Sequence, residues 1–393
     1  MPSPLEGRRW WLAGIGGAGM SGYALLARAW GAEVRGWDRA RTPYLERLQD
    51  IDVDISEDPP PAPEGWEAYV SSAFTGLVAG KSRAELLAEL VSLRQTLVVA
   101  GAHGKTTTAG MIAFCLARLG RDPAWLIGGD IPQLGGNAGT GEGWLVVEGD
   151  ESDRTIAALR PRIAVVTNVD LDHHTTFGSR AEVEALFENW LADVPDVVRG
   201  DELPPYHGRL ALSGEHNRRN AASALAALAY TGVSREQAEP VLAEFTGAGR
   251  RLERRGEAGG VELYDDYAHH PAEIGATLQA ARDGGRLLVL FQPHLYSRTR
   301  HLARELAAAL AAADAVAVTE IYAAREQPVA GVSGKLIVDA LAERRPGMPL
   351  AWTPALADGA RFLAQHARAG DRILTVGAGD VDRAGALLLE LLG

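Results

Sequence analysis

Short apolar runs alternate along this chain with longer segments in which apolar positions recur at helical spacing. Such runs are typical of buried strands, and a helix between two of them is typical of a parallel sheet. The runs that predict strands are residues 10–13, 33–37, 96–99, 144–147, 163–166, 261–264, 287–291, 315–319 and 373–376. Helices are predicted, among others, over residues 20–30, 83–93, 109–119 and 217–230. The pattern predicts an α/β protein with functional residues at the C-terminal ends of strands.

These elements form three α/β blocks, which span residues 1–93, 94–250 and 251–393. A chain of 393 residues is too long for one ordinary domain, so we expect each block to be a domain. A cluster of prolines between residues 59 and 63 predicts a surface loop in the first block.

Composition narrows the classes of partner. The formal net charge of −12 disfavours nucleic acid and anionic membranes. The first residues do not resemble a signal peptide, and no apolar run nears the length of a membrane-spanning helix. We therefore expect a cytoplasmic protein that acts on small molecules as a monomer or homodimer. Its single cysteine, Cys115, is expected in the core.

The most informative motif follows the predicted strand 96–99. It reads Ala-Gly-Ala-His-Gly-Lys-Thr-Thr-Thr over residues 100–108. A glycine-bearing loop between a strand and a helix directs backbone N–H groups at a polyphosphate. Lys105 would reach the phosphates, and the Thr106 hydroxyl would supply an oxygen to Mg²⁺. The spacing is a shortened phosphate loop, and the alternative, a random glycine-rich turn, is disfavoured by the strand–loop–helix context.

Acidic residues follow the next two strands of the second block. Residues 148–153 come directly after a strand, where a Mg²⁺–ATP enzyme places a metal ligand, although a solvated acidic turn is the alternative. Residues 167–174 place His173 beside Asp170 and Asp172. A lone histidine is usually structural, but two neighbouring acids favour a metal or substrate role here. Mg²⁺ prefers oxygen, so His173 would be an unusual ligand in an oxygen-rich shell.

A second glycine loop follows the first strand of the chain. Gly14, Gly16 and Gly19 match the dinucleotide-binding fingerprint, and Asp38 lies about where a ribose-binding acid would. The loop could hold NAD, hold another diphosphate, or only pack a helix on a strand. The extra Gly17 and the following residues 20–22 predict an open loop suited to a nucleotide-sugar diphosphate.

Further motifs lie at helix starts and strand ends. Residues 214–221 present Asn217 and Asn220 near the start of a helix, and helix capping explains Asn217 but not Asn220. A basic pair, Arg250 and Arg251, lies at the join between the second and third blocks. Residues 264–271 combine acids with histidines, and residues 291–300 combine histidine with arginines that could bind a carboxylate or phosphate. A solvated basic turn is the alternative for the last motif.

In this order, the motifs resemble those of the Mur ligases over the whole chain. Residues 265–271 and 291–294 resemble the branch of the family that adds alanine. The resemblance implies a Rossmann-like N-terminal domain for a UDP-sugar, a central P-loop ATPase domain and a Rossmann-like C-terminal domain for an amino acid. It implies that ATP and Mg²⁺ activate the carboxylate of UDP-N-acetylmuramate as an acyl phosphate, which the amine of L-alanine attacks.

The resemblance also assigns roles to individual residues. The catalytic set is Lys105, Glu148 and His173, and the metal ligands are Thr106, Glu148 and His173. ATP would contact Gly101, His103, Gly104, Lys105, Thr106, Thr107, Asn217, Asn220, Arg251 and Asp266. The UDP-sugar would contact Gly16, Gly17, Ala18, Gly19, Met20, Ser21, Ser71 and Ser72. The amino acid would contact His270, His294, Arg298 and Tyr322.

Several positions depart from the family's pattern. Leu295 stands where the family has arginine, Arg325 stands where it has glycine, and the segment between residues 174 and 216 is short, which implies a reduced central sheet. The central block has no lysine after Lys105, so it cannot contain the carbamylated lysine of sister ligases. The alternatives are therefore a ligase for another acid or amino acid, and a non-catalytic nucleotide-sugar-binding homologue. An NAD oxidoreductase would leave the ATP motif unexplained.

Overall fold

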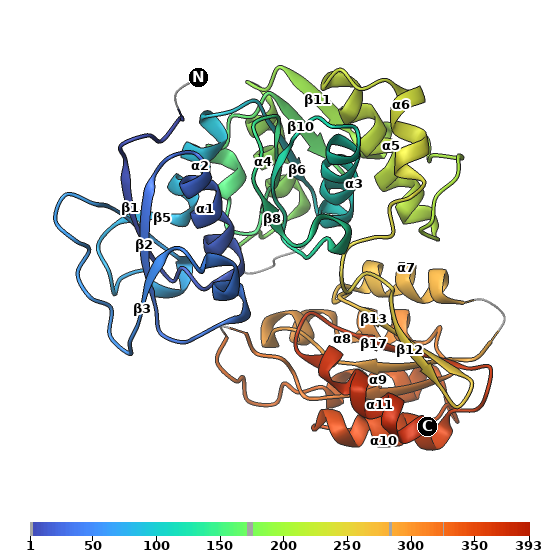
Figure 1. The fold of residues 1–393 in the computed structure, drawn as a ribbon. Helices are drawn as coiled ribbons and strands as arrows, with labels where there is room; N and C mark the ends of the chain where they lie inside the picture. Colours follow the sequence, from blue (N-terminus) through green and yellow to red (C-terminus); the bar gives the residue numbers. More distant parts are fainter. Residues whose placement is uncertain (1–2, 171–175, 283–284, 325) are drawn as a thin grey trace. The chain divides into compact units, whose positions relative to one another are not determined.

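The computed structural model describes residues 3–170, 176–282, 285–324 and 326–393. It contains three β-sheets covered by helices, which confirms the predicted α/β class (Figure 1). The chain forms two compact units, divided near residue 248. The first unit contains the first two sheets and the second unit contains the third. The predicted domain boundaries at residues 93/94 and 250/251 fall in connections between sheets and remain a prediction.

The first sheet is parallel, with strand order β3-β2-β1-β4-β5, the order of a doubly wound fold. Its strands are β1 (Arg9–Ala13), β2 (Glu33–Asp38), β3 (Asp52–Ile55), β4 (Glu67–Val70) and β5 (Lys81–Ser82). The helices α1 (Ala18–Ala29) and α2 (Arg83–Ser92) share a hydrophobic cluster with one face. Trp11, Trp37 and Phe74 cover the other face. The turns η1 (Pro43–Leu48) and η2 (Ser72–Phe74) complete this part.

The helix predicted over residues 20–30 is present, whereas the prediction that residues 20–22 leave the loop open is wrong. Helix α1 begins at Ala18, and the side chains of Met20 and Ser21 are buried inside it. Glycine usually disfavours a helix interior, but here tertiary packing overrides that propensity. An added Cβ at Gly22 would lie 2.9 Å from the Ala138 side chain and 3.0 Å from that of Leu126. Gly22 therefore allows α1 to pack closely against Leu126 and Ala138.

The second sheet has the order β11-β10-β6-β9-β7-β8 and is parallel except for β8. Its strands are β6 (Thr96–Ala100), β7 (Ala124–Leu126), β8 (Ala138–Gly139), β9 (Leu145–Glu148), β10 (Ile163–Val166) and β11 (Asp196–Arg199). Its helices are α3 (Lys105–Arg118), α4 (Arg180–Leu191), α5 (Glu215–Tyr230) and α6 (Arg235–Leu242), with the turns η3 (Pro132–Leu134), η4 (Thr155–Ala158) and η5 (Gly200–Glu202). The short segment before α5 supplies α4 and the edge strand β11. Cys115 is fully buried, as predicted.

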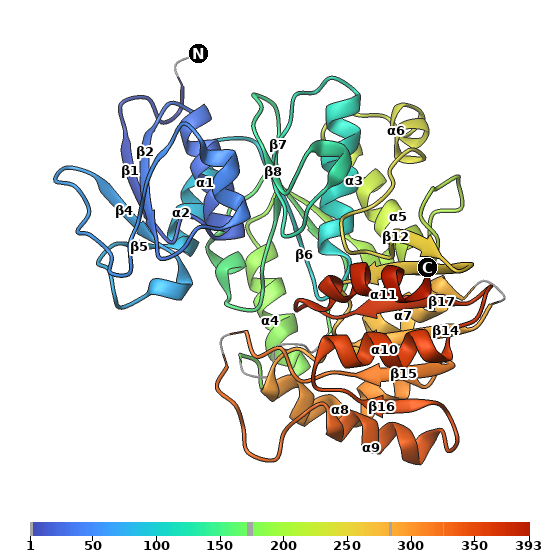
Figure 2. The same ribbon diagram turned by 60° about the horizontal axis from the view of Figure 1, so that its bottom comes forward.

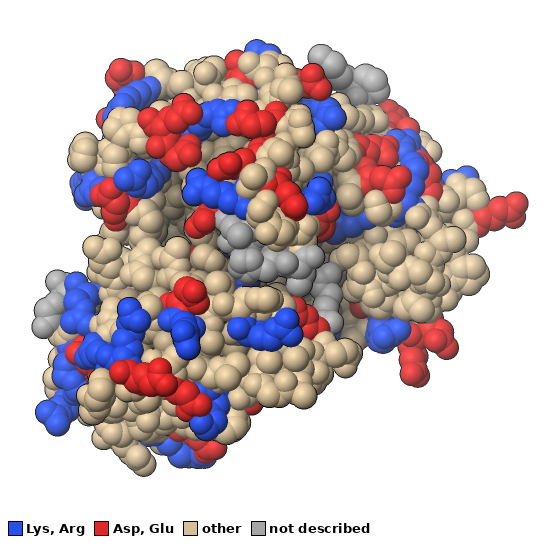
Figure 3. All heavy atoms as spheres, turned by 180° about the vertical axis from the view of Figure 1, so that it is seen from behind, with Lys and Arg blue, Asp and Glu red and all other residues tan. Residues whose placement is uncertain are grey.

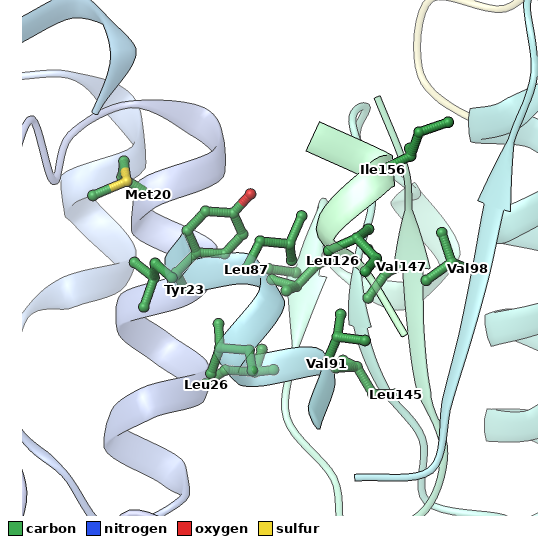
Figure 4. Close-up of a cluster of buried hydrophobic side chains, with 14 of the residues drawn as sticks. Met20, Tyr23, Leu26, Leu87, Val91, Val98, Leu126, Leu145, Val147 and Ile156 are labelled. Atoms are coloured by element: carbon green, nitrogen blue, oxygen red, sulfur yellow. The ribbon is translucent and has the colours of Figure 1, made fainter. Parts of the chain in front are cut away.

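The first two sheets share one hydrophobic core. Side chains of α1 and α2, among them Tyr23 and Leu87, face Leu126 and Val147 of the second sheet (Figure 4). Polar contacts reinforce this packing, because the Asn137 amide donates to the carbonyl of Ala18 at 3.1 Å and accepts from Arg47 at 3.0 Å. The glycine loop before α1 and the phosphate loop before α3 therefore belong to the same compact unit.

The third sheet has the order β12-β13-β17-β14-β15-β16 and is parallel except for β12. Its strands are β12 (Glu253–Ala258), β13 (Val261–Asp266), β14 (Leu287–Phe291), β15 (Ala315–Val318), β16 (Leu350–Trp352) and β17 (Arg372–Val376). Its helices are α7 (Pro271–Ala281), α8 (Tyr296–Leu310), α9 (Lys335–Arg344), α10 (Leu356–His366) and α11 (Ala384–Leu392), with the turn η6 (Val381–Arg383) before α11. Alternate residues of β14 pack against α7, α8 and α9 on one face and against α10 and α11 on the other (Figure 2).

Charged side chains of both signs are interspersed on the face drawn in Figure 3. No helix among the described residues combines the length and apolar character that crossing a bilayer requires.

Substitution of Gly22 tests the shared core. Gly22→Ala adds a methyl group that must displace Ala138 or Leu126, so we expect a loss of about 1–3 kcal/mol in unfolding free energy and a lower Tm. The matched control is Gly275→Ala in α7, where an added Cβ meets no described atom within 4 Å. That change should instead stabilise by up to about 1 kcal/mol. Thermal unfolding measures both, and equal shifts would contradict close packing at α1.

Candidate functional site

The phosphate loop is built on glycines with left-handed backbone conformations. Gly101 has a φ of +129° and Gly104 a φ of +82°. An added side chain would collide with Thr167 at the first position and with Asn220 at the second. Helix α3 begins at Lys105, four residues before the predicted start at residue 109, because Gly104 caps it directly. The first N–H groups of α3 therefore lie at the end of the loop, as phosphate binding requires.

Two residues that follow β10 hold this loop from the side. The Asn168 amide accepts from the His103 N–H at 3.0 Å and donates to the His103 carbonyl at 2.9 Å. The Thr167 hydroxyl donates to the same carbonyl at 2.7 Å, and the Ala102 N–H donates to the Asn168 carbonyl at 3.1 Å. The sequence pointed to acids and histidines in this stretch and missed these two residues. Their signal was their place directly after a strand, since β10 pairs with β6.

Thr106 and Glu148 meet at the edge of the sheet. The Thr106 hydroxyl donates to Glu148 Oε1 at 3.0 Å, and the Gly128 N–H donates to Glu148 Oε2 at 2.7 Å. Glu148 is the last residue of β9, which pairs with β6, and this pairing places it beside the phosphate loop. A hydroxyl and a carboxylate are ligands that suit Mg²⁺.

The third predicted metal ligand, His173, lies outside the described residues. Within the described ranges, no group of three or more histidines, cysteines or acids is arranged to hold a metal ion. Thr106 and Glu148 still fit a magnesium ion, because both present oxygen atoms. The oxygen atoms of a bound nucleotide would complete the coordination shell.

Lys105 is held within the loop as a cation. Its Nζ donates to the Gly101 carbonyl at 2.5 Å and to Glu151 Oε1 at 3.0 Å, and the Glu151 side chain is only 4% exposed. Burial alone lowers the pKa of Lys105, but Glu151, Glu148 and Asp150 raise it by more, so its net pKa lies above the ordinary value. The lysine is therefore protonated at neutral pH, although its side chain is only 17% exposed.

The first glycine loop is held open by its own neighbours. The Gly16 N–H donates to Asp38 Oδ2 at 2.8 Å, and the Thr42 hydroxyl donates to the Gly16 carbonyl at 2.7 Å. Asp38 therefore holds the loop with one of its carboxylate oxygens. Gly17 caps α1, and the first hydrogen bond inside the helix runs from the Ser21 N–H to the Gly17 carbonyl. The N–H groups of Ala18, Gly19 and Met20 precede it and suit a diphosphate.

The remaining predicted UDP-sugar residues lie around the same loop. Ser71 is buried and packs against Gly14, while Ser72 begins the turn η2 and is exposed. The side chains of Met20 and Ser21 are each only 2% exposed, so these residues can offer a ligand little besides their backbone.

A cavity of about 190 Å³ lies between the two sheets of the first unit. Ala18 and Gly19 line one end, and Gly128 and Glu148 line the other. Tyr23, Leu87, Leu126 and Val147, all labelled in Figure 4, contribute apolar surface. The cavity therefore joins the start of α1 to the carboxylate that contacts Thr106.

Asn217 and Asn220 lie on α5 in the first unit. Asn220 packs against Gly104, and its amide donates to Asn217 Oδ1 at 3.4 Å. This contact explains Asn220, which helix capping did not.

Arg251 and Asp266 belong to the second unit. The Arg251 guanidinium lies 5.5 Å from the Tyr267 ring centroid and 3.9 Å from Glu273. Asp266 is buried and accepts from the N–H groups of Leu252 and Ala268 at 2.7 and 2.8 Å. Burial raises the pKa of Asp266 to about 6.

Strand β13 continues two residues beyond its predicted end, so Asp265 lies within the sheet. Asp265 accepts from Arg250 Nε at 2.7 Å and from the Thr375 hydroxyl at 2.6 Å. Arg250 also donates to the carbonyls of Gly377 and Gly379, each at 2.8 Å. Arg250 therefore fixes the start of the second unit to its central strands.

Three of the four predicted amino-acid residues come together. The rings of His294 and Tyr322 stack with centroids 6.0 Å apart, and Arg298 Nη1 lies 3.0 Å from His294 Nδ1. Because an arginine can only donate, Nδ1 of His294 is the acceptor, and its proton lies on Nε2. His269, which the sequence did not single out, lies 5.5 Å from the His294 ring. The fourth predicted residue, His270, caps α7 and is buried.

Comparisons with known proteins identify the family of this chain. A family model of the Mur ligase middle domain matches residues 99–197, and one of the Mur ligase glutamate ligase domain matches residues 250–379. The UDP-N-acetylmuramate–L-alanine ligase of Kineococcus radiotolerans is 40% identical, with 97% of this chain and 95% of that protein covered. The protein of the same name from Renibacterium salmoninarum is 37% identical, with 96% and 95% covered. The chain belongs to the Mur ligase family.

Solved structures give the same result for this Mur ligase. The crystal structure of UDP-N-acetylmuramate-alanine ligase from Thermotoga maritima has a TM-score of 0.77 at 25% identity, with 98% of each chain covered. The murein peptide ligase of Psychrobacter arcticus has a TM-score of 0.66 at 25% identity, with 98% of this chain and 99% of that chain covered. The alignment with the Kineococcus protein runs over 453 positions, more than the 393 residues of this Mur ligase, which is therefore shorter within the matched region.

Replacing Asn168 tests how the phosphate loop of this Mur ligase is held. Asn168→Ala removes two hydrogen bonds to His103, so we expect roughly tenfold weaker ATP binding with the fold retained. The control is Gln133→Ala, because Gln133 forms the same kind of bridge between the Glu244 carbonyl and the Thr246 N–H. Calorimetric titration with ATP measures both variants. Equal ATP affinity in both would contradict a specific role for Asn168.

The raised pKa of Asp266 gives a pH-dependent stability. A carboxyl group with a raised pKa holds its proton longer in the folded state, so its contribution to stability falls as pH rises from about 4 to about 6. We compare the unchanged protein with Asp266→Asn. The difference in Tm between them (unchanged protein minus variant) should fall as pH rises over this range, and the corresponding change in unfolding free energy is about 3 kcal/mol at most. Unfolding in dilute solution at several pH values tests this, and a difference that rises with pH would contradict it.

Proposed function

We propose that this Mur ligase uses ATP and Mg²⁺ to join L-alanine to UDP-N-acetylmuramate, with ADP and phosphate as the other products. One observation carries the proposal: a single cavity joins the start of α1 to the Thr106–Glu148 pair. A nucleotide sugar held by its diphosphate at α1 can extend its carboxylate through this cavity toward a triphosphate at α3. The high coverage of relatives named for this reaction supports the same choice.

The first chemical step transfers a phosphoryl group. A carboxylate oxygen of the sugar attacks the γ-phosphorus of ATP, the bond to the β-phosphate oxygen breaks, and ADP leaves. Lys105 supplies a permanent positive charge beside the loop, because the nearby acids keep it protonated. Thr106 and Glu148 would hold Mg²⁺, which neutralises phosphate charge when bound. The N–H groups at the start of α3 orient the phosphates.

The second step forms the amide. The amine nitrogen of alanine attacks the activated carbonyl carbon, the bond from that carbon to the phosphate oxygen breaks, and the departing phosphate takes up the proton that the nitrogen loses. Arg298 and His294 both present hydrogen-bond donors that suit the carboxylate of an amino acid. His294 already accepts at Nδ1, so it orients this carboxylate rather than removing the proton from the amine. Tyr322, 39% exposed, stacks on His294 and would border the amino-acid side chain.

A second candidate is a Mur-type ligase for a different amino acid or peptide. Leu295 has a φ of +69° where the chain enters α8, directly beside His294. Arg325, the other departure from the family pattern, lies outside the described residues. The similarity to the structure of a murein peptide ligase supports a peptide as the alternative substrate. We assign the protein to the cytoplasm, as the location of its nucleotide substrates, and leave monomer or homodimer as alternatives.

Phosphate release tests the proposal directly. Mixing the protein with ATP, Mg²⁺, UDP-N-acetylmuramate and L-alanine should release phosphate well above mixtures that lack any one component. Replacing L-alanine by other amino acids or by an alanyl tripeptide separates the second candidate. Lys105→Ala should lower kcat/KM by at least roughly a thousandfold, because the developing phosphate charge loses its buried cation.

The control is Lys335→Ala, since Lys335 is exposed and its ion pair runs across one helix turn to Asp339. This variant should keep full activity. Substantial phosphate release by Lys105→Ala would remove the assigned role of the lysine. Release that is independent of the nucleotide sugar would contradict the proposed function itself.

A further inference from the structure

Arg83 occupies an unusual position in the first unit. It is the first residue of α2, directly after the N-cap Ser82, and its side chain lines the cavity between α1 and Glu148. The positive end of the helix dipole disfavours a cation in the first turn. Helix stability therefore does not explain why an arginine stands at position 83.

Its contacts hold the guanidinium without saturating it. Arg83 Nε donates to the Tyr23 hydroxyl at 3.2 Å, and its guanidinium lies 5.9 Å from the Tyr23 ring centroid. The nearest carboxylate oxygen paired with it, Asp153 Oδ2, lies 3.7 Å from Nη1, which is beyond hydrogen-bond distance. An arginine has five N–H donors, and among the described residues only the one on Nε makes a hydrogen bond.

The cavity itself has a cation on one wall and an anion at one end. Of its lining residues that the structure describes, Arg83 is the only one with a positive charge and Glu148 the only one with a negative charge. An added Cβ on Gly19 would lie 3.4 Å from Arg83 Nε, so the guanidinium lies beside the start of α1. An anionic group that passes from α1 toward Glu148 must therefore pass Arg83.

We propose that Arg83 binds the carboxylate of the nucleotide sugar and holds it for transfer of the phosphoryl group. This inference rests on the proposed function. In the proposed function the N–H groups of α1 bind the diphosphate, and Arg83 is the only cation among the described residues that line the cavity. The planar guanidinium matches a carboxylate through two parallel hydrogen bonds. Tyr23 is a positioning residue, because it touches the guanidinium and fixes its direction.

Two ligands separate the carboxylate from the diphosphate. UDP-N-acetylmuramate has the carboxylate, whereas UDP-N-acetylglucosamine has the same diphosphate without it. Arg83→Gln should weaken binding of the first ligand roughly 10- to 100-fold and leave binding of the second within about twofold. In turnover, Arg83→Gln should raise KM for the nucleotide sugar and also lower kcat, because a misplaced carboxylate attacks phosphorus less often.

Three comparisons make the outcome decisive. Arg28→Gln is the matched control, since Arg28 lies exposed on α1 and pairs with Asp50 at 3.4 Å, and it should change neither affinity. ATP affinity and Tm confirm that Arg83→Gln remains folded. Arg83→Lys keeps the charge but not the planar fork, so it should restore affinity for UDP-N-acetylmuramate only in part.

Equal weakening for both ligands would assign Arg83 to the diphosphate and overturn the proposal, and so would unchanged binding of both. If the unchanged protein bound neither ligand, the proposed function would fail with it. If the unchanged protein bound UDP-N-acetylmuramate normally and Arg83→Gln did too, only the role of Arg83 would fail.

Discussion

The shared core of the first unit is the constraint on which the chemistry depends. Two helices, α1 and α3, each begin at the C-terminal edge of their own sheet, and we propose that the first N–H groups of each bind an anion. A loose contact between the sheets would let the two anion sites drift apart. The packing of α1 and α2 on β7 and β9 prevents this, because well-packed apolar side chains transmit position rather than absorb it. Hydrophobic packing therefore sets the distance between the proposed sites for the nucleotide sugar and for ATP.

Close packing explains some glycines that their sequence motifs assign to ligand-binding loops. Gly22 belongs to the glycine-rich start of the chain, yet it admits the side chains of Ala138 and Leu126 to the surface of α1. Gly101 and Gly104 serve the phosphate loop, yet each is also in contact with a polar residue that a side chain would displace. A glycine in such a motif therefore has two roles, one toward the ligand and one toward the neighbouring element.

The sequence predicted the elements with strong apolar periodicity and the motifs at their ends. Strands such as β10 and β14 and the helix α2 lie where the pattern placed them, because burial on both faces leaves a clear signal. Edge strands such as β3, β8 and β16 were missed, since they are short and only partly buried. Asn168 and Arg83 were missed for a different reason. Their importance comes from residues far along the chain that folding brings beside them, and no local spacing records that contact.

The candidate site contains few positively charged side chains, as the composition of the chain leads us to expect. The chain has a net charge of −12 and only three lysines, yet its proposed ligands are polyanions. Backbone N–H groups at two helix starts supply much of the positive potential without any side-chain charge. The single lysine of the phosphate loop is then kept ionised by buried acids, chiefly Glu151. Burying a cation costs desolvation free energy, and an ion pair with a nearby anion must offset that cost. In the phosphate loop that anion is present as Glu151, and this pairing explains why Lys105 can remain charged before any nucleotide binds.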